Sequence, residues 1–460
     1  MHGHQTAALQ SDDNLILHPW EVLQDYGHNA RTVIARGEGI HVYDTEGNRL
    51  IDGPGGMWCV NVGHGRAEIA DAAAAQIRNM AYCSPWALAN APAAELARSL
   101  VELAPDGLEH VFFTTGGSTA VDSALRFVMF FNNYLGRQEK KHVISRANAY
   151  HGSTYLSASV SGKERDRNYF DFEKGFIHHL PSPNPYRRPA GMSLEAFCDE
   201  KVADLENKIS ELGPERVAAF IAEPILASGG VIIPPPGYHK RCLEVCRRHD
   251  VLYISDEVVT AFGRLGHFFA SEAVFGIVPD IITVAKGITS GYLPLGAVLI
   301  SERLVSQITG ERAKQGIFSN GFTYSGHPVT CAAALENIEI IRRENLLERV
   351  RDTGAYLQER LRELSELPIV GDVRGMGLMG CVECSIPDTD SDLSVDYEVG
   401  NRIDAHCQRL GLLVRPLVNM CVMSPPLIIT REQIDDLIDI LRRGIERTMD
   451  DLRRERLWSG

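Results

Sequence analysis

From about residue 67 onward, short apolar stretches rich in β-branched residues alternate with longer stretches that carry apolar residues at helical spacing. Apolar stretches of this length are typical of buried strands, and their alternation with helices predicts a mostly parallel sheet with helices on both faces. Ligands of such sheets bind beyond the carboxyl ends of the strands. The predicted strands are residues 111–114, 142–145, 218–222, 251–255, 281–285 and 297–300.

Two further regions flank this alternation. Residues 40–52 alternate apolar and polar positions around a Glu-Gly-Asn turn, which predicts a β-hairpin in a small N-terminal sheet. After Pro328 a long helical stretch runs through Glu348 and Arg360, and a smaller α+β unit with a final helix at residues 431–452 follows. We therefore expect an N-terminal segment that contributes to a small domain, a large domain and a C-terminal small domain, at residues 1–66, 67–328 and 329–460.

Composition limits the partners of the chain. Its 460 residues are 44% hydrophobic and 23% charged, which is typical of a globular protein with a large core. With 46 basic and 60 acidic residues the formal net charge is -14, which repels nucleic acids and anionic membranes. No apolar run approaches the roughly 20 residues of a membrane span, and residues 1–13 lack the features of a signal peptide. We therefore expect a cytoplasmic protein.

The ten cysteines are scattered along the chain. Cys381 and Cys384 form a lone CxxC pair without a second pair or a histidine at ligand spacing, so we expect no zinc site there. Cys242 and Cys246 lie four residues apart in a predicted helix, where buried free thiols are the commoner arrangement. A reducing compartment accounts for all ten.

Asp256 and Lys286 carry the strongest chemical signal. They lie 30 residues apart, and each directly follows a predicted strand. Pyridoxal phosphate requires such a pair, because an acid partners its ring nitrogen and an amine binds its aldehyde. Taken singly, each residue has a simpler interpretation: Asp256 could be a cap of the next helix, and Lys286 could be a surface lysine before a glycine turn. Their occurrence together beyond the strands favours the cofactor site.

Other strand ends supply further candidates for the same site. Glu223 is a second acid that could orient Asp256 or a cofactor hydroxyl, or could be a simple turn acid. The ring of Tyr150 could stack on one side of a flat cofactor, while Val258 covers the other side. His151 could be only a structural hydrogen-bond donor. Tyr150 alone would more often be a core residue.

The segment TTGGSTA at residues 114–120 predicts an anion-binding turn. It follows a strand and opens a helix, so backbone N–H groups, the Ser118 and Thr119 hydroxyls and a helix dipole worth about 1 kcal/mol can meet a phosphate. The segment matches neither GxGxxG nor a P-loop. A dinucleotide oxidoreductase on a doubly wound sheet would also need an acid about 20 residues further on, which is lacking, so this alternative loses support.

Three longer strings carry a family resemblance: YISDEVVTAFGR at residues 253–264, ITVAKGITSGYLPLGAVLI at 282–300 and GFTYSGHPVTCAAAL at 321–335. With them the chain resembles class III pyridoxal-phosphate aminotransferases of fold type I, and within that class the omega-aminotransferases that use pyruvate. The similarity runs from about Trp20 to the last helix, with the motifs in the family order. It implies an α/β fold with a large domain and a smaller α+β domain built from both termini.

The resemblance assigns roles to the cofactor residues. It implies that Lys286 is the Schiff-base lysine and that Asp256 is the partner of the pyridinium nitrogen. It also implies that Tyr150 stacks on the cofactor ring and that Val258 is the aliphatic platform on the other side. Gly117 and Ser118 correspond to the phosphate cup. His151 and Glu223 remain candidate cofactor contacts.

The resemblance also implies a second subunit. Phe322 and Thr323 match a loop that, in this family, reaches the phosphate of the neighbouring subunit. We therefore expect a homodimer with composite active sites and an inactive monomer. A tetramer remains an open alternative.

The substrate side follows from the same resemblance. Trp58 and Trp86 match aromatic positions that line the substrate pocket, with Ala227 and Ser228 at its other wall. Arg415 matches a mobile arginine that clamps the carboxylate of an amino acid or keto acid, and whose guanidinium fork suits that group. An exposed arginine in a C-terminal loop is the plainer alternative for Arg415.

One position departs from the family pattern. Family members usually carry Ser-Gly-Ser-Glu where this chain has Gly116-Gly117-Ser118-Thr119, so one hydroxyl is lost. Backbone donors should still hold the phosphate, although the role of Gly116 stays open. We expect a transaminase that moves an amino group from an amine or omega-amino acid to a keto acid such as pyruvate, in ping-pong half reactions. An aminomutase or a decarboxylating aminotransferase is the alternative.

Overall fold

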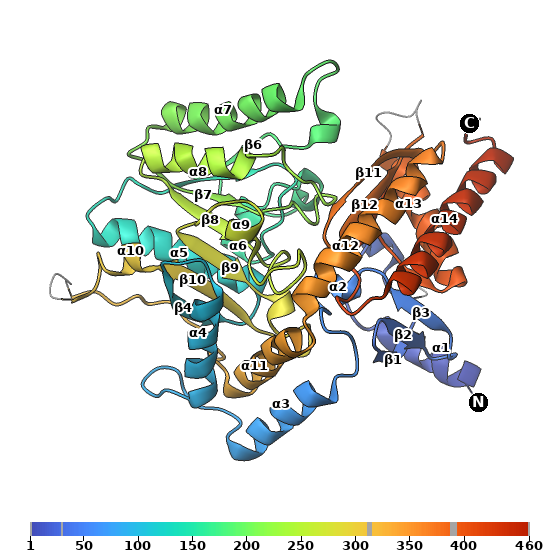
Figure 1. The fold of residues 1–460 in the computed structure, drawn as a ribbon, viewed down its shortest axis with the longest axis horizontal. Helices are drawn as coiled ribbons and strands as arrows, with labels where there is room; N and C mark the ends of the chain where they lie inside the picture. The colour runs from blue at the N-terminus through green and yellow to red at the C-terminus, as the bar shows by residue number, and fades with distance from the viewer. Residues whose placement is uncertain (1, 29–30, 311–314, 387–392, 459–460) are drawn as a thin grey trace.

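The computed structural model describes residues 2–28, 31–310, 315–386 and 393–458. Its centre is a seven-stranded sheet with the order β4-β10-β9-β8-β7-β5-β6 (Figure 1). All six strands predicted after residue 67 belong to this sheet, which confirms the α/β prediction. The strands are β4 (Leu108–Thr114), β5 (His142–Arg146), β6 (Ile177–Leu180), β7 (Val217–Ala222), β8 (Leu252–Asp256), β9 (Ile281–Val284) and β10 (Gly296–Ser301).

The sheet is parallel from β6 to β9, and β10 runs antiparallel to its neighbours β9 and β4. The carboxyl ends of β5, β7, β8 and β9 therefore lie at the same edge. The sequence did not predict β6, because its four residues Ile-His-His-Leu carry too few apolar positions to give a strand signal.

Helices cover both faces of the sheet. On β8, Leu252 and Ile254 belong to the core cluster under α5 (Gly117–Tyr134), whereas Tyr253 belongs to the cluster under α7 (Leu194–Leu212) and α8 (Tyr238–Arg248). This alternation follows from the two-residue period of a strand. The remaining helices of this part are α3 (Ala67–Asn79), α4 (Ala91–Leu103), α6 (Tyr155–Val160), α9 (Ala270–Ala273), α10 (Glu302–Val305) and α11 (Pro328–Arg343).

Both ends of the chain meet in a second region, at the right of Figure 1. One sheet has the order β1-β2-β3-β13, and the other has the order β11-β12-β15-β14. The predicted N-terminal hairpin is β2–β3, and β13 from the C-terminal part pairs in parallel with β3. The strands are β1 (Ile34–Glu38), β2 (His41–Asp44), β3 (Arg49–Asp52), β11 (Val370–Met376), β12 (Met379–Cys384), β13 (Leu412–Leu413), β14 (Arg415–Leu417) and β15 (Met420–Met423).

The helices of this second region largely match the sequence prediction. The final helix is α14 (Arg431–Arg454), as expected. The predicted long helical stretch after Pro328 is interrupted, because Asn345 adopts a left-handed conformation with φ of 51° between α11 and α12 (Leu346–Arg362). The other helices are α1 (His2–Asp13), α2 (Gly55–Trp58) and α13 (Leu393–Leu410). Within the described residues, we find no helix with the length and apolar character of a membrane span.

Candidate active site

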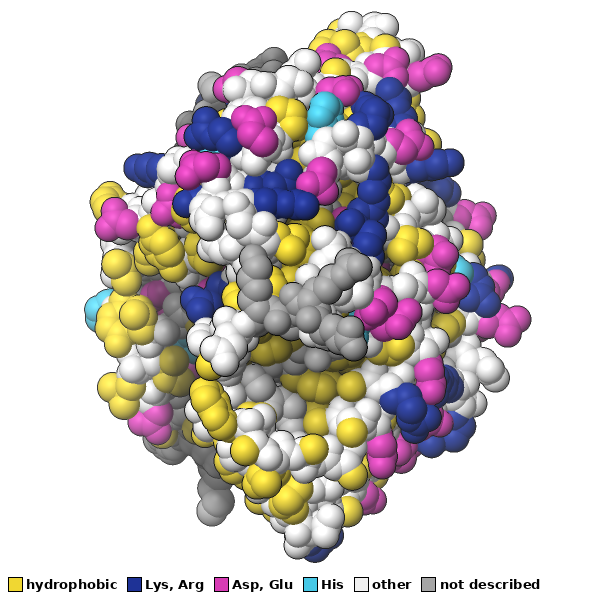
Figure 2. All heavy atoms as spheres, turned by 90° about the vertical axis from the view of Figure 1, so that its left-hand side faces the viewer, with side chains coloured by type: hydrophobic (Ala, Val, Ile, Leu, Met, Phe, Trp, Pro, Cys, Tyr) yellow, Lys and Arg dark blue, Asp and Glu magenta, His cyan; other side chains and the backbone are white. Residues whose placement is uncertain are grey.

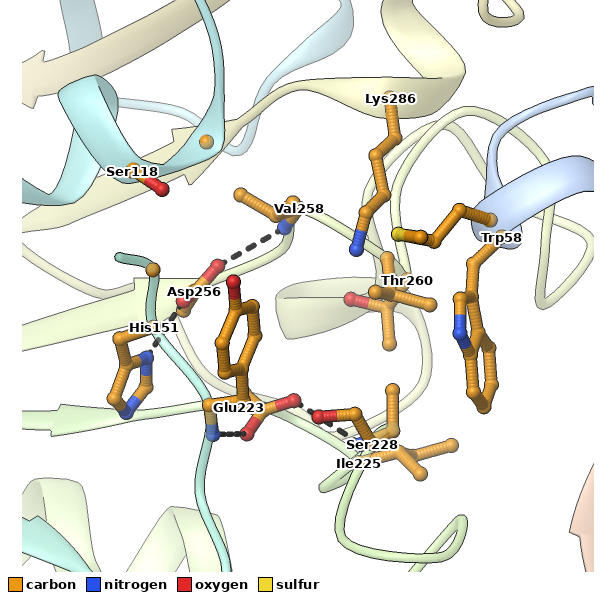
Figure 3. A pocket seen from close by; sticks show the side chains of 16 residues that line it. Trp58, Ser118, His151, Glu223, Ile225, Ser228, Asp256, Val258, Thr260 and Lys286 are labelled. Carbon is orange, nitrogen blue, oxygen red and sulfur yellow. Dashed lines mark hydrogen bonds and ion pairs between the residues drawn. The ribbon is translucent and has the colours of Figure 1, made fainter. Parts of the chain in front are cut away.

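A pocket with a volume of about 140 Å³ lies beyond the carboxyl ends of β7, β8 and β9, next to the start of α5 (Figure 3). The strand ends, the α5 terminus and α2 bring together residues that are far apart in the sequence. The predicted site residues that line the pocket are Trp58, Gly117, Ser118, Tyr150, His151, Glu223, Ala227, Ser228, Asp256, Val258 and Lys286.

Lys286 lies two residues beyond β9, and its side chain extends into the pocket (Figure 3). Its backbone is left-handed, with φ of 49°, which is uncommon for a residue with a side chain and is found mostly where the surrounding structure enforces it. Burial lowers the pKa of Lys286, and the nearby carboxylate of Asp256 only partly opposes this effect. The environment therefore favours the neutral, nucleophilic amine.

Asp256 is the last residue of β8 and is almost completely buried. Its Oδ2 lies 2.6 Å from His151 Nδ1, and its Oδ1 accepts a hydrogen bond of 3.1 Å from the backbone N–H of Val258. These bonds fix the direction of the carboxylate. His151 is thus a direct partner of Asp256, which the sequence did not specify.

Glu223 follows β7 and holds the backbone of two neighbouring segments. Its Oε1 accepts a hydrogen bond from the N–H of Tyr150, and its Oε2 accepts one from the N–H of Ala227, each 3.0 Å long. Burial raises the pKa of Glu223. Among the described residues we find no bond from Glu223 to Asp256, so the carboxylate positions Tyr150 and Ala227 instead.

The segment predicted to bind a phosphate is the turn before α5, at the edge of the pocket. Ser118 Oγ accepts a hydrogen bond of 3.0 Å from the N–H of Ser153, which leaves its own proton available for an anion. Thr119 Oγ1 instead donates to the carbonyl of Gly116 at 2.9 Å. A Cβ on Gly117 would lie 3.1 Å from Val258, whereas a Cβ on Gly116 would meet no heavy atom within 4 Å. A side chain at residue 117 would therefore press on Val258, whereas one at residue 116 would have space.

The aromatic residues differ in their relation to the pocket. Trp58 is 2% exposed, has a left-handed backbone and forms one wall (Figure 3). The Tyr150 hydroxyl lies 2.9 Å from Ser153 Oγ, and burial raises its pKa. Trp86, by contrast, is 92% exposed and does not line the pocket formed by the described residues.

Three other predicted site residues also lie outside the pocket lining. Phe322 and Thr323 belong to a segment held by Tyr82, whose hydroxyl donates to the Thr323 carbonyl at 2.9 Å. Arg415 begins β14, and burial lowers its pKa while Tyr150 raises it. Within the described part of the chain, Arg415 has no ion pair. A single chain therefore brings the other predicted cofactor residues together, but not Phe322, Thr323 and Arg415.

Some pocket residues were missed by the sequence analysis. Gly152 follows His151 and has φ of 139°, and a Cβ there would lie 2.4 Å from Ser157 Oγ and 2.6 Å from Ser118 Oγ. The glycine beside His151 could have signalled this close approach. No pattern in the sequence distinguished the other missed residues, which are Met57, Ile225, Val259 and Thr260.

The cysteines fit the simple prediction of free thiols. Cys242 and Cys246 are buried in α8, and Cys381 and Cys384 are buried on β12. Burial raises the pKa of Cys242 to about 12, so this thiol stays protonated. The described residues contain no group of histidine, cysteine, aspartate or glutamate that could hold a metal ion.

Comparison with known proteins places this geometry in a family. The model of the family described as aminotransferase class-III matches residues 23–445. The chain is 40% identical to a putrescine–pyruvate aminotransferase from Pseudomonas aeruginosa over 96% of both chains, and 38% identical to a diaminobutyrate–2-oxoglutarate transaminase from Halomonas elongata over 97% of both. The crystal structure of an (S)-enantioselective omega-transaminase from Thermomicrobium roseum has a TM-score of 0.91 and 39% identity, covering 97% of this chain and 98% of its own.

Proposed function

We propose that this protein takes amino groups from amines or omega-amino acids and transfers them to pyruvate. The chain belongs to the class-III aminotransferase family and is therefore a pyridoxal-phosphate-dependent transaminase. The observation that carries the choice of acceptor is the 40% identity, over 96% of both chains, to an enzyme named for putrescine and pyruvate. The two substrates use the same site in turn, as ping-pong half reactions require.

The pocket residues fit pyridoxal phosphate part by part. The cup at the start of α5 offers a hydroxyl proton and helix N–H groups for a phosphate. The cup, the Asp256 carboxylate and the Lys286 amine lie around one cavity, as a flat cofactor with a phosphate, a ring nitrogen and an aldehyde requires. Gly117 and Ser118 would hold the phosphate, and Tyr150 and Val258 would cover the two faces of the ring. Asp256 would bind the ring nitrogen, and Lys286 would bind the aldehyde.

When bound, pyridoxal phosphate supplies an aldehyde that links to amines and a ring that accepts electrons from a substrate carbon that loses its proton. Lys286 is the proton carrier in this chemistry. Because burial lowers its pKa, the free amine would lose its own proton more readily and so could accept one from the substrate carbon. The same amine would then deliver this proton to the cofactor, and the second half reaction would use it in the opposite direction.

Asp256 acts as the charge partner of the ring nitrogen. A carboxylate in a buried position stabilises a positive charge beside it more strongly than it would in water. The bonds from His151 and Val258 keep both oxygens oriented, so no rearrangement is needed when charge develops. Glu223 contributes by fixing the backbone of Tyr150 and Ala227, two residues that line the pocket, through its two hydrogen bonds.

A donor panel with pyruvate as the fixed acceptor tests the proposed function. Purified chain loaded with pyridoxal phosphate should form alanine in equal amount to the amine consumed, and Lys286→Ala should form none. Diamines, omega-amino acids and aryl amines belong on the panel, because the Trp58 wall narrows one side of the pocket and offers an aromatic face to flat donors. Rearranged or decarboxylated products without alanine would contradict the transaminase assignment to pyruvate.

We further propose that two chains form a homodimer with composite active sites. Phe322 and Thr323 lie outside the pocket of their own chain, and the segment after α1 exposes large apolar residues that a neighbouring chain could cover. Figure 2 likewise shows hydrophobic side chains gathered on the left and lower parts of one face. The most exposed apolar residues of the N-terminal segment are Leu15 (80%), Leu23 (74%), Leu17 (63%) and Val22 (61%).

Mixed dimers test this arrangement. Lys286→Ala chains lack the reactive amine, and chains with both Phe322→Ala and Thr323→Ala lack the loop contact to the neighbouring phosphate. In a mixed composite dimer, one site combines the intact Lys286 of one chain with the intact loop of the other, while the second site lacks both. Half of the randomly paired dimers are mixed, so co-refolded chains should recover roughly a quarter of the wild-type activity. No recovery, or a fully active monomer in analytical ultracentrifugation, would contradict the composite site.

We also place the protein in the cytoplasm. The ten free cysteines suit a reducing compartment, where thiols are kept reduced. Fractionation of cells that express the tagged full chain tests this placement, and recovery in a membrane or secreted fraction would contradict it.

A further inference from the structure

A second lysine lies beside the pocket. Lys163 is on the turn after α6, and its Nζ is 5.3 Å from the centre of the Tyr150 ring. Tyr150 lines the pocket and Lys163 does not, so the ammonium contacts a residue of the pocket wall from outside the pocket lining. An aromatic face stabilises a cation but cannot neutralise its charge.

Lys163 has no carboxylate within ion-pair distance in the described part of the chain. The acid of its own turn, Asp166, pairs with Arg165 at 3.4 Å instead. Burial lowers the pKa of Lys163 to about 8. Lys163 is half-buried, and a partly desolvated ammonium without an ion pair is stabilised when a ligand supplies the missing negative charge.

Charged groups from several elements face Lys163. Arg165 and Asp166 are on its own turn, Glu223 is at the end of β7, and Arg415 is on β14. The Glu223 oxygens already accept bonds from two backbone N–H groups. Arg415, like Lys163, has no ion pair among the described residues. Two cations without ion pairs, from different parts of the chain, therefore repel each other electrostatically, and an anion between them would be stabilised.

We propose that Lys163 is a specificity-determining residue that binds, together with Arg415, the carboxylate of the keto acid or amino acid substrate. The proposal rests on the proposed use of a keto acid. The ammonium supplies a charge-assisted hydrogen bond, while the guanidinium supplies a planar fork. A carbonyl acceptor without a carboxylate gains nothing from either group.

The protonation of Lys163 makes this binding depend on pH. Below about pH 8 the ammonium is charged and attracts a carboxylate, and above it the neutral amine loses that attraction. The KM for pyruvate should therefore rise as the pH increases through this value. An arginine at the position would stay charged, because its pKa is above about 12.

Three variants test the proposal: Lys163→Met, Lys163→Arg and, as a matched control, Lys240→Met at an exposed position on α8. The acceptors are pyruvate and propanal, which lacks the carboxylate, with a saturating aryl amine donor. Lys163→Met should raise the KM for pyruvate by about 10- to 150-fold, the worth of one charge-assisted hydrogen bond, and leave the KM for propanal and kcat within about twofold. Lys163→Arg and Lys240→Met should keep the low KM for pyruvate.

The pH profile supplies a second readout. Between about pH 7 and pH 9.5 the wild-type KM for pyruvate should rise, whereas the Lys163→Arg profile should be flatter and the Lys163→Met profile high throughout. An unchanged KM for pyruvate in Lys163→Met, or an equal rise for propanal, would overturn the proposal. If the wild-type chain forms no alanine from pyruvate, the proposed function fails instead. Propanoate binding, measured from the cofactor absorbance, then tests Lys163, because Lys163→Met should weaken it and equal binding would overturn the proposal.

Discussion

The inner and the outer parts of the site differ in how completely one chain builds them. In the inner part, Asp256 lies 2.6 Å from His151, and Glu223 holds two backbone N–H groups at 3.0 Å. In the outer part, Trp86 is 92% exposed and Arg415 has no ion pair among the described residues. Strand ends of one sheet fix the inner part, because the fold itself determines their spacing. We infer that the outer part, which determines the substrate, depends on loops, on the region formed by both termini and on a second chain.

Removal of the reactive amine should have the largest effect. Lys286→Ala should lower kcat by about 10³- to 10⁴-fold, because both the covalent link and the proton transfer are lost. Single-turnover kinetics with an aryl amine and pyruvate measure this loss. Methylamine, which replaces the missing amine from solution, should restore part of the activity. A loss below about tenfold would mean that the inner part contains another proton carrier.

Neutralisation of the buried acid should have the next largest effect. Asp256→Asn keeps the size of the side chain and can still bond to His151, but it removes the negative charge. Since loss of one partner of a buried charge pair costs about 3 to 5 kcal/mol, kcat should fall by roughly 10² to 10³-fold. Steady-state kinetics and the visible spectrum of the cofactor measure the change. His151→Asn, which leaves the carboxylate in place, should have a smaller effect, and the reverse order would contradict the assignment.

A large part of the inner site follows from the sequence for a simple physical reason. Apolar strands in a parallel sheet align their carboxyl ends, so residues that follow the strands, such as Asp256, Glu223 and Lys286, must lie close together. The position of His151 on Asp256 was not predictable, because the bond joins residues 105 positions apart through side-chain geometry. The strand β6 was missed because two of its four residues are histidines.

The outer part was less predictable from the residues. The roles of Trp86, Phe322, Thr323 and Arg415 came only from the family resemblance, because no periodicity or strand position singles them out. Lys163 gave no sequence signal at all, since its proximity to Tyr150 arises from the path of the turn after α6. Residues that act through loop paths or through a second chain leave no local pattern.

Truncation of Trp86 tests whether the outer part needs a second chain. If the partner subunit places Trp86 at the pocket, Trp86→Ala should raise the KM for an aryl amine by about tenfold, because an aromatic contact with its buried area is lost. The affinity for pyridoxal phosphate should not change. Trp58→Ala is the matched control, because Trp58 forms a wall of the pocket within one chain. It should raise the KM for the aryl amine whether or not a second chain contributes Trp86. A KM unchanged by Trp86→Ala would mean that the outer part is built by a single chain.

The smallest expected effect concerns the cup, where the chain departs from its family by lacking one hydroxyl. Gly116 has φ of 165°, which any residue adopts, and a Cβ there meets no heavy atom within 4 Å. Gly116→Ser should therefore fit without strain and add one donor for the phosphate. Because a hydrogen bond contributes about 0.5 to 1.5 kcal/mol, the Kd for pyridoxal phosphate should fall by roughly 2- to 12-fold in a fluorescence titration of the apo chain.

Gly117→Ser is the matched control for this change. Its Cβ would lie 3.1 Å from Val258, the aliphatic side of the proposed ring site, so cofactor affinity should fall although the same hydroxyl is added. If the Kd for pyridoxal phosphate falls in Gly116→Ser and rises in Gly117→Ser, cofactor affinity is limited by the number of donors at residue 116 and by packing at residue 117. Equal effects would mean that the cup adjusts as a loop does, and the contrast between a rigid inner part and an adaptable outer part would no longer hold.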